Sequence, residues 1–120
     1  MSLSDDFQNM INRLNVFGRL EELEKKVADL EVRVRQLEIL LEELRTDFGN
    51  WKYKSTEDLL RFDGRLDLTQ RTLRRTIQYI EANKLVEDAQ ELNDSLRGEH
   101  KWVSQNTALV QKELRARGVH

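Results

Sequence analysis

Histidine is the first residue type to consider for chemistry, and the chain has only two, His100 and His120. A zinc site needs further ligands at a helical spacing, and Glu99 beside His100 does not provide one. Cysteine is absent, and the five glycines are too far apart to form a phosphate-binding loop. We therefore expect no catalytic residues, no metal and no cofactor, and the chain is not predicted to be an enzyme.

The other group that could bind a ligand is Arg71, Arg74 and Arg75, because guanidinium groups contact phosphates. Together with Arg61 and Arg65 they make five cations against two aspartates in the same stretch. Basic regions that bind DNA carry a much denser positive charge. A nucleic-acid-binding module is therefore the weakest of the functions considered, and neutralisation by acidic residues elsewhere in the chain accounts better for the cluster.

The composition indicates long helices rather than strands and turns. The 120 residues are 35% charged and 38% hydrophobic, with a net charge of −2, no proline and five glycines. The first twenty residues include Asp5 and Asp6, and no stretch is long and apolar enough to cross a bilayer. We expect an all-α, soluble protein made in the cytoplasm, with no signal peptide and no membrane span.

A run of apolar residues at alternating spacings of three and four covers residues 19–52 and is the strongest signal in the chain. Such a heptad repeat is the pattern of a left-handed coiled coil. Its first core position holds Leu20, Val27, Val34, Leu41 and Phe48, and its fourth holds Leu23, Leu30, Leu37, Leu44 and Trp51. We predict that these residues form the core of an oligomer.

Charges on the two flanks of this repeat predict how copies of the chain pair. A cation precedes each of the first three core pairs, and an acid follows each of them. Parallel helices in register bring opposite flanks together, whereas antiparallel copies would set like charges against each other. The predicted interchain ion pairs are Arg19 with Glu24, Lys26 with Glu31, and Arg33 with Glu38. The pattern therefore favours a parallel homo-oligomer.

Two signals disagree about the number of strands. Valine at the first core position with leucine at the fourth, as in Val27 and Leu30, is the combination associated with dimers. Residues 19–24 and 33–38, however, resemble the Arg-h-x-x-h-Glu pattern of many short trimeric coiled coils, where h is apolar, and residues 26–31 are a near match. In a trimer an arginine stem covers apolar surface while its guanidinium reaches a carboxylate of the next chain. We favour three strands over two.

The segments on either side of the repeat are also predicted to be helical. Residues 1–18 form an amphipathic segment that starts near Ser4 and ends at Gly18. Its apolar face carries Phe7, Met10 or Ile11, Leu14 and Phe17. Because so short a helix cannot bury this face alone, we expect it to dock on a neighbouring chain or another protein, with a frayed terminus as the alternative.

Residues 55–117 are predicted to form two further helices, at about 56–81 and 86–115. Ser55 and the acidic residues after it favour a helix start. The two apolar stripes are Leu59, Phe62, Leu66, Leu73, Ile77 and Ile80, followed by Leu85, Ala89, Leu92, Leu96, Val103, Val110 and Leu114, with Trp102 and Leu109 widening the second. A turn near Asn83 would give an antiparallel hairpin, and a continuous helix with a phase slip is the alternative.

Charge favours the hairpin. The arginines of residues 71–75 end the first of these helices, and the acidic residues Glu87, Asp88, Glu91 and Asp94 begin the second. An antiparallel hairpin would bring the two groups side by side. Exposed ion pairs contribute only about 0–1 kcal/mol each, so this match bears on orientation more than on stability.

The function predicted from these features is structural self-assembly. A parallel, homotrimeric coiled coil followed by a helical hairpin or further bundled helices would act as a fibre, neck or connector in a larger assembly such as a virus or phage particle, with other structural proteins as partners. This prediction rests on architecture alone. The alternatives are a dimeric coiled-coil adaptor of the cell and a monomeric, spectrin-like three-helix bundle of residues 20–48, 56–81 and 86–115.

Overall fold

The computed structural model describes residues 2–119, and this part of the chain contains helices and no strand. The all-α fold class is therefore confirmed. The elements, in chain order, are α1 (Leu3–Val16), α2 (Leu20–Phe48), the short 3-10 helix η1 (Trp51–Tyr53), α3 (Thr56–Ala82) and α4 (Gln90–Ala116). They form an elongated bundle of 56 × 24 × 19 Å.

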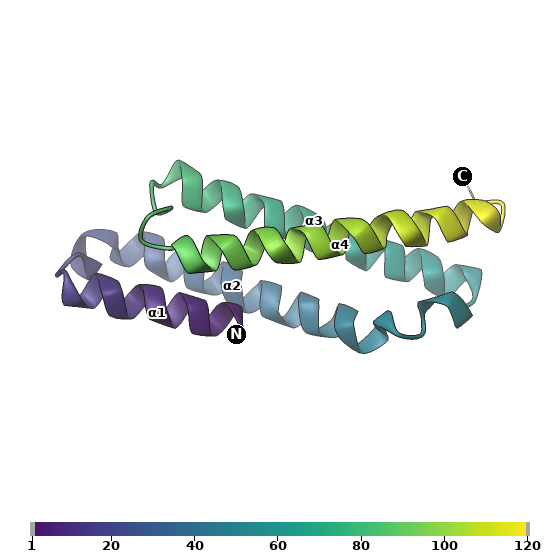
Figure 1. Cartoon of the computed structure of the whole chain (residues 1–120), viewed down its shortest axis with the longest axis horizontal. Helices are drawn as coiled ribbons and strands as arrows, with labels where there is room; N and C mark the ends of the chain where they lie inside the picture. The colour runs from purple at the N-terminus through teal and green to yellow at the C-terminus, as the bar shows by residue number, and fades with distance from the viewer. Residues whose placement is uncertain (1, 120) are drawn as a thin grey trace.

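Three long helices run the length of the bundle, and α1 covers half of it (Figure 1). The helix α3 packs on both α2 and α4, and α1 packs on the same two helices. Where α1 begins, the Ser4 backbone N–H donates to Glu38 Oε1 at 2.7 Å, which places it beside the middle of α2. One end of the molecule is thus a four-helix bundle and the other a three-helix bundle.

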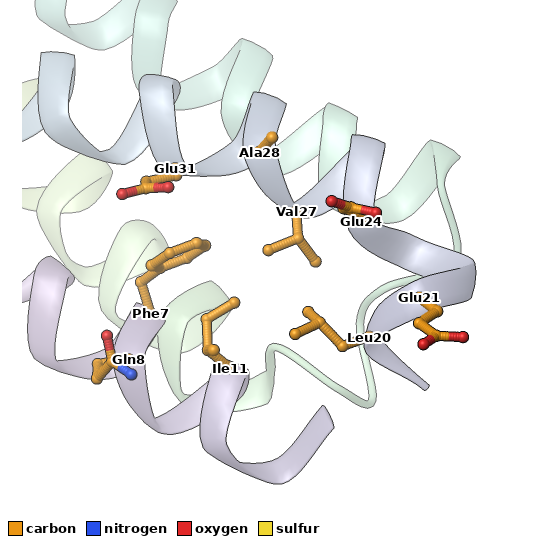
Figure 2. A pocket seen from close by; sticks show the side chains of 9 residues that line it. All are labelled: Phe7, Gln8, Ile11, Leu20, Glu21, Glu24, Val27, Ala28 and Glu31. Carbon is orange, nitrogen blue, oxygen red and sulfur yellow. The ribbon is translucent and has the colours of Figure 1, made fainter. Parts of the chain in front are cut away.

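The amphipathic face of α1 lies against its own chain. Leu3, Phe7, Met10 and Leu14 are buried, and Phe7 points towards Val27 of α2 (Figure 2). Its N-terminus is capped by Ser2 rather than by Ser4, because the Ser2 hydroxyl accepts from the Asp5 backbone N–H at 3.1 Å. The segment predicted to dock on a neighbouring chain or another protein therefore has an intrachain partner in the structure.

Three of the helices end with the same backbone turn. After α1, α3 and α4 a residue with positive φ follows the last turn: Gly18 at +67°, Lys84 at +58° and Gly118 at +87°. In each case the next backbone N–H bonds back to the helix five residues earlier, as Leu85 does to Ile80 at 2.9 Å. This is the Schellman motif, which satisfies carbonyls at the end of a helix. Lys84 is the only one of the three that is not glycine.

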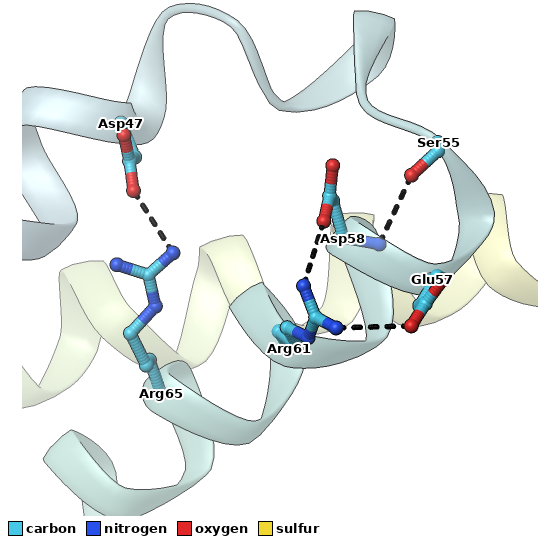
Figure 3. A network of polar contacts seen from close by, with 6 residues as sticks. All are labelled: Asp47, Ser55, Glu57, Asp58, Arg61 and Arg65. Carbon is cyan, nitrogen blue, oxygen red and sulfur yellow. Dashed lines mark hydrogen bonds and ion pairs between the residues drawn. The ribbon is translucent and has the colours of Figure 1, made fainter.

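The connection between α2 and α3 is held by polar contacts (Figure 3). The Ser55 hydroxyl accepts from the Asp58 backbone N–H at 3.2 Å, which caps α3. Arg61 pairs with Asp58 at 3.2 Å within the first turns of the helix. Arg65 reaches back to Asp47 of α2 at 2.9 Å. The predicted helix start at Ser55 is therefore present, and α3 is tied to the end of α2.

The C-terminus of α4 closes the same end of the bundle. The Arg117 guanidinium donates to the carbonyl oxygens of Lys54 at 2.8 Å and Lys52 at 3.1 Å. Trp51, in η1, is only 8% exposed and belongs to the core. These contacts satisfy carbonyls that the irregular segment between α2 and α3 would otherwise leave without partners.

The helices α3 and α4 form an antiparallel hairpin, with the chain turning at residues 83–89. The charge match predicted for this hairpin is wrong. Contacts between Arg97 and Glu81 at 2.5 Å, and between Gln70 and Ser104 at 3.1 Å, set the register of the two helices. In this register residues 71–75 lie opposite residues near 100, about two turns away from the acidic group at residues 87–94. Among the charged groups of the hairpin, only the Arg97–Glu81 pair crosses between the helices in the described residues.

Candidate functional site

The heptad core predicted for an oligomer lies inside this single chain. Seven of its residues are buried: Val27, Leu30, Val34, Leu37, Leu41, Leu44 and Trp51. The remaining three, Leu20, Leu23 and Phe48, are partly buried and pack against the same core. The apolar stripes of α3 and α4 are buried with them. The structure therefore provides intrachain partners for the whole repeat.

The basic flank of the repeat faces the α3–α4 side of the bundle. Arg19 pairs with Asp88, in the turn before α4, at 2.7 Å. The Arg33 guanidinium lies over the ring of Tyr79, 4.5 Å from its centre. The Tyr79 hydroxyl donates to the backbone carbonyl of Lys26 at 3.2 Å. Burial and the neighbouring Asp29 carboxylate raise the pKa of Tyr79.

The acidic flank faces α1. Glu38 accepts from the first turn of α1, where a carboxylate is favoured by the helix dipole. Glu31 pairs with Arg35 of its own helix, and Glu24 borders a groove described below. The charges that predicted parallel pairing thus also suit the two different neighbours of α2 in this bundle. Interchain pairing of these six residues stays a prediction.

A groove of about 560 Å³ runs between α1 and α2 and is the candidate functional site. Figure 2 shows its apolar side chains directed towards a common space, with glutamates at its border. From α1 the lining residues are Phe7, Gln8 and Ile11, and from α2 they are Leu20, Glu21, Glu24, Val27, Ala28 and Glu31. We call this surface the α1–α2 groove.

Helical spacing explains how the sequence builds the α1–α2 groove. Its α1 residues are Phe7 and Ile11, one turn apart, with Gln8 beside them. On α2 the lining residues follow one stripe of the helix from Leu20 to Glu31. Ala28 is exposed and is the only alanine of α2. Its short side chain lies on the α2 border of the groove, between Glu24 and Glu31, where a longer residue would narrow the groove (Figure 2).

The charged residues that line the α1–α2 groove are all acidic and all belong to α2. Glu21, Glu24 and Glu31 bring three carboxylates to its α2 edge. Glu31 is paired with Arg35, whereas neither Glu21 nor Glu24 takes part in an ion pair within residues 2–119. No cation lines the groove. An apolar ligand with positive charges beside it would therefore match this surface.

Two exposed apolar residues precede Leu20 of the groove by only a few residues in the sequence. Val16, the last residue of α1, and Phe17, in the turn that follows it, are 79% and 74% exposed. Singly exposed apolar residues of this kind are common on proteins.

Two other titratable groups, in α3 and α4, have shifted pKa values. Burial, with the Asp67 carboxylate as a second cause, raises the pKa of Asp63, although a hydrogen bond from Gln111 opposes the change. Burial lowers the pKa of His100, and the cations Arg74 and Arg97 lower it further. These groups lie apart in the α3–α4 hairpin and do not converge on one cleft.

The described part of the chain holds no cluster of three or more histidine, cysteine, aspartate or glutamate side chains that could bind a metal. Between residues 2 and 119, no helix is long and apolar enough to span a membrane. His120 lies outside the described residues.

The apolar face of residues 1–18 is evident from the sequence, but the groove that this face forms with α2 is not. The groove uses positions beside the heptad core, such as Glu21 and Ala28, which the oligomer interpretation left on the surface. A lone alanine on a helix rich in long side chains was the available signal.

Comparisons with known proteins found no similar protein: no family model, no curated protein and no solved structure matches this chain.

Proposed function

We propose that this protein is a non-enzymatic interaction module that binds an amphipathic helix of a partner protein in the α1–α2 groove. The partner helix carries apolar residues on one face and lysine or arginine beside them. The observation that supports this proposal is the combination of an apolar floor with three carboxylates along one edge.

Recognition of a helix in a groove depends on apolar anchors spaced one turn apart. Ile11 and Leu20 are only partly buried in the groove, so a partner side chain placed between them removes further apolar surface from water. The carboxylates at Glu21 and Glu24 would attract the basic residues of the partner and select against an acidic helix.

A synthetic helical peptide with a leucine stripe flanked by lysines is a suitable probe. We expect the double variant Glu21→Lys, Glu24→Lys to bind it at least about tenfold more weakly, because attraction at the edge becomes repulsion. Fluorescence anisotropy of the labelled peptide measures this affinity. The double variant Glu42→Lys, Glu43→Lys is the control, because both are exposed residues of α2 outside the groove and the change in net charge is the same. An equal loss in the control would show that only net charge matters.

Ala28→Tyr tests the groove by its shape. Ala28 is exposed, so a larger side chain is accommodated without disturbing the core, and it would fill the space that the partner needs. We expect the variant to keep the helical circular dichroism of the parent and to lose peptide binding. Unchanged affinity in this variant would place the peptide elsewhere on the surface.

Self-assembly is the second candidate. The observation in its favour is the heptad repeat with three sign-consistent flank pairs in residues 19–38. A parallel trimer or dimer through this repeat, whether in a virus particle or as an adaptor, requires α2 to leave the bundle, because Leu30 and Leu37 are fully buried against the other helices. The groove, by contrast, is available without any rearrangement.

A further inference from the structure

A second hollow, of about 240 Å³, lies between α3 and α4 and is distinct from the α1–α2 groove. Its lining residues are Arg74, Ile77, Gln78 and Glu81 from α3 and Arg97 and His100 from α4. On each helix they are spaced by three or four residues, so they share one face. The register of the hairpin brings these two faces together.

Polar groups in this hollow are without partners or are only partly satisfied. His100 Nε2 is buried and has no hydrogen-bond partner among the described residues. Arg74 forms no ion pair in the part of the chain that the structure describes. One guanidinium nitrogen of Arg97 pairs with Glu81 at 2.5 Å, which leaves its other nitrogens available to donate hydrogen bonds. A buried polar atom without a partner is rare and calls for an explanation.

We propose that this hollow binds a single phosphate group, held by the guanidinium groups of Arg74 and Arg97 and by His100. Arginine presents its donors in a planar fork that matches the oxygens of phosphate. Gln78 adds an amide donor at the edge. Glu81 is the one carboxylate in the lining, and it pairs with a single nitrogen of the Arg97 guanidinium.

The charges around His100 support this assignment. Arg74 on one helix and Arg97 on the other face the imidazole, Glu81 is the only acid of the hollow, and repulsion from the two cations adds to burial in lowering the histidine pKa. A bound phosphate dianion would place negative charge beside His100 and would favour its protonated form. Binding of the anion and protonation of His100 should therefore strengthen each other.

Titration of the full-length protein with inorganic phosphate, followed by nuclear magnetic resonance at constant ionic strength, tests the proposal. We expect saturable shifts of the His100 imidazole signals and a higher His100 pKa at saturation. Arg74→Gln should weaken phosphate binding by about tenfold or more, because it removes a charge-assisted hydrogen bond. Glu81→Gln should strengthen binding, since it removes the one repulsive charge.

Arg75→Gln is the matched control. Arg75 is exposed, adjacent to Arg74 and outside the hollow, so the variant loses the same charge from the same helix. We expect it to change the phosphate affinity by less than about twofold. Equal losses in the two variants, or shifts of His100 that never saturate, would overturn the site in favour of non-specific ionic contact.

Binding of a single-stranded oligonucleotide is a further test of the phosphate site. If Arg71→Gln, Arg74→Gln and Arg75→Gln all weaken binding of a single-stranded oligonucleotide alike, while inorganic phosphate has no effect on His100, the arginines form a surface for nucleic acid and the single-phosphate site is wrong. None of these outcomes depends on the peptide bound in the α1–α2 groove.

Discussion

At the scale of single residues, His100 links protonation to folding. Burial, Arg74 and Arg97 lower its pKa from the ordinary value of 6.5, so the unfolded chain takes up a proton near that pH before the folded chain does. Stability contributed by the neutral imidazole is therefore complete above pH 6.5 and is lost as the pH falls from that value to the lower pKa of the folded state.

The corresponding variant is His100→Gln, which cannot take up a proton. We expect its free energy of unfolding to fall less than that of the parent between about pH 7.5 and about pH 5.5. Urea unfolding at the two pH values measures the difference. His120 is present in both proteins and cancels from the comparison. An unchanged pH dependence would show that His100 is equally solvated in the folded and unfolded states.

Lys84 adopts a backbone conformation that costs free energy. It ends α3 with a φ of +58°, a region in which a side chain is disfavoured and glycine is not. We expect Lys84→Gly to raise the free energy of unfolding by about 0.5–1 kcal/mol. Lys84→Ala is the control and should bring no such gain, because alanine keeps the Cβ atom. Thermal unfolding followed by circular dichroism distinguishes the two.

This turn also explains why the sequence left the hairpin and a continuous helix both open. The helix ends at Gly18 and Gly118 carry the residue that the motif prefers, whereas the end of α3 carries lysine. Local preference therefore gave no stop signal near Asn83. The sequence evidence for a turn is the loss of phase in the apolar pattern and the charge match, and the charge match is wrong. Packing of the two apolar stripes against each other determines the hairpin.

At the scale of elements, the bounds of the long helices followed from the apolar pattern, while their partners did not. Residues 56–81 are predicted to be helical and the structure has Thr56–Ala82, whereas residues 86–115 are predicted for the last helix and α4 begins only at Gln90 and ends at Ala116. The flank charges of α2 predicted a like partner, but in this bundle the basic flank meets Asp88 and Tyr79, which belong to other segments. Spacing identifies the buried face of a helix, and it does not identify which helix covers that face.

The first helix provides an element-scale prediction. Ser2 caps α1 through its hydroxyl, whereas only the backbone N–H of Ser4 bonds to Glu38. We expect Ser2→Ala to destabilise α1 by about 1 kcal/mol, and Ser4→Ala to have an effect of a few tenths of that amount. Hydrogen exchange of the α1 amides measures this local loss of stability. Equal effects of the two substitutions would place the cap at another residue.

In the molecule as a whole, the residues of the heptad core belong to the core of the bundle, together with residues of α1, α3 and α4. Leu30 is fully buried, and Val32 of the same helix is 66% exposed. We expect Leu30→Ala to lower the free energy of unfolding by about 2–5 kcal/mol, since it leaves a cavity, and Val32→Ala to change it by less than about 0.5 kcal/mol. Urea unfolding provides both values. A loss of similar size at Val32 would mean that another chain covers the outer face of α2.

The bundle completes this core within one chain, and we propose that the groove and not the heptad repeat faces a partner. Light scattering coupled to size-exclusion chromatography tests it directly. We predict a particle with the mass of one chain, and a mass that stays constant as the protein is diluted. A particle of three chains, or of two, that dissociates when Leu30 or Leu37 is changed to aspartate would contradict the claim and return the repeat to the role of an oligomer core.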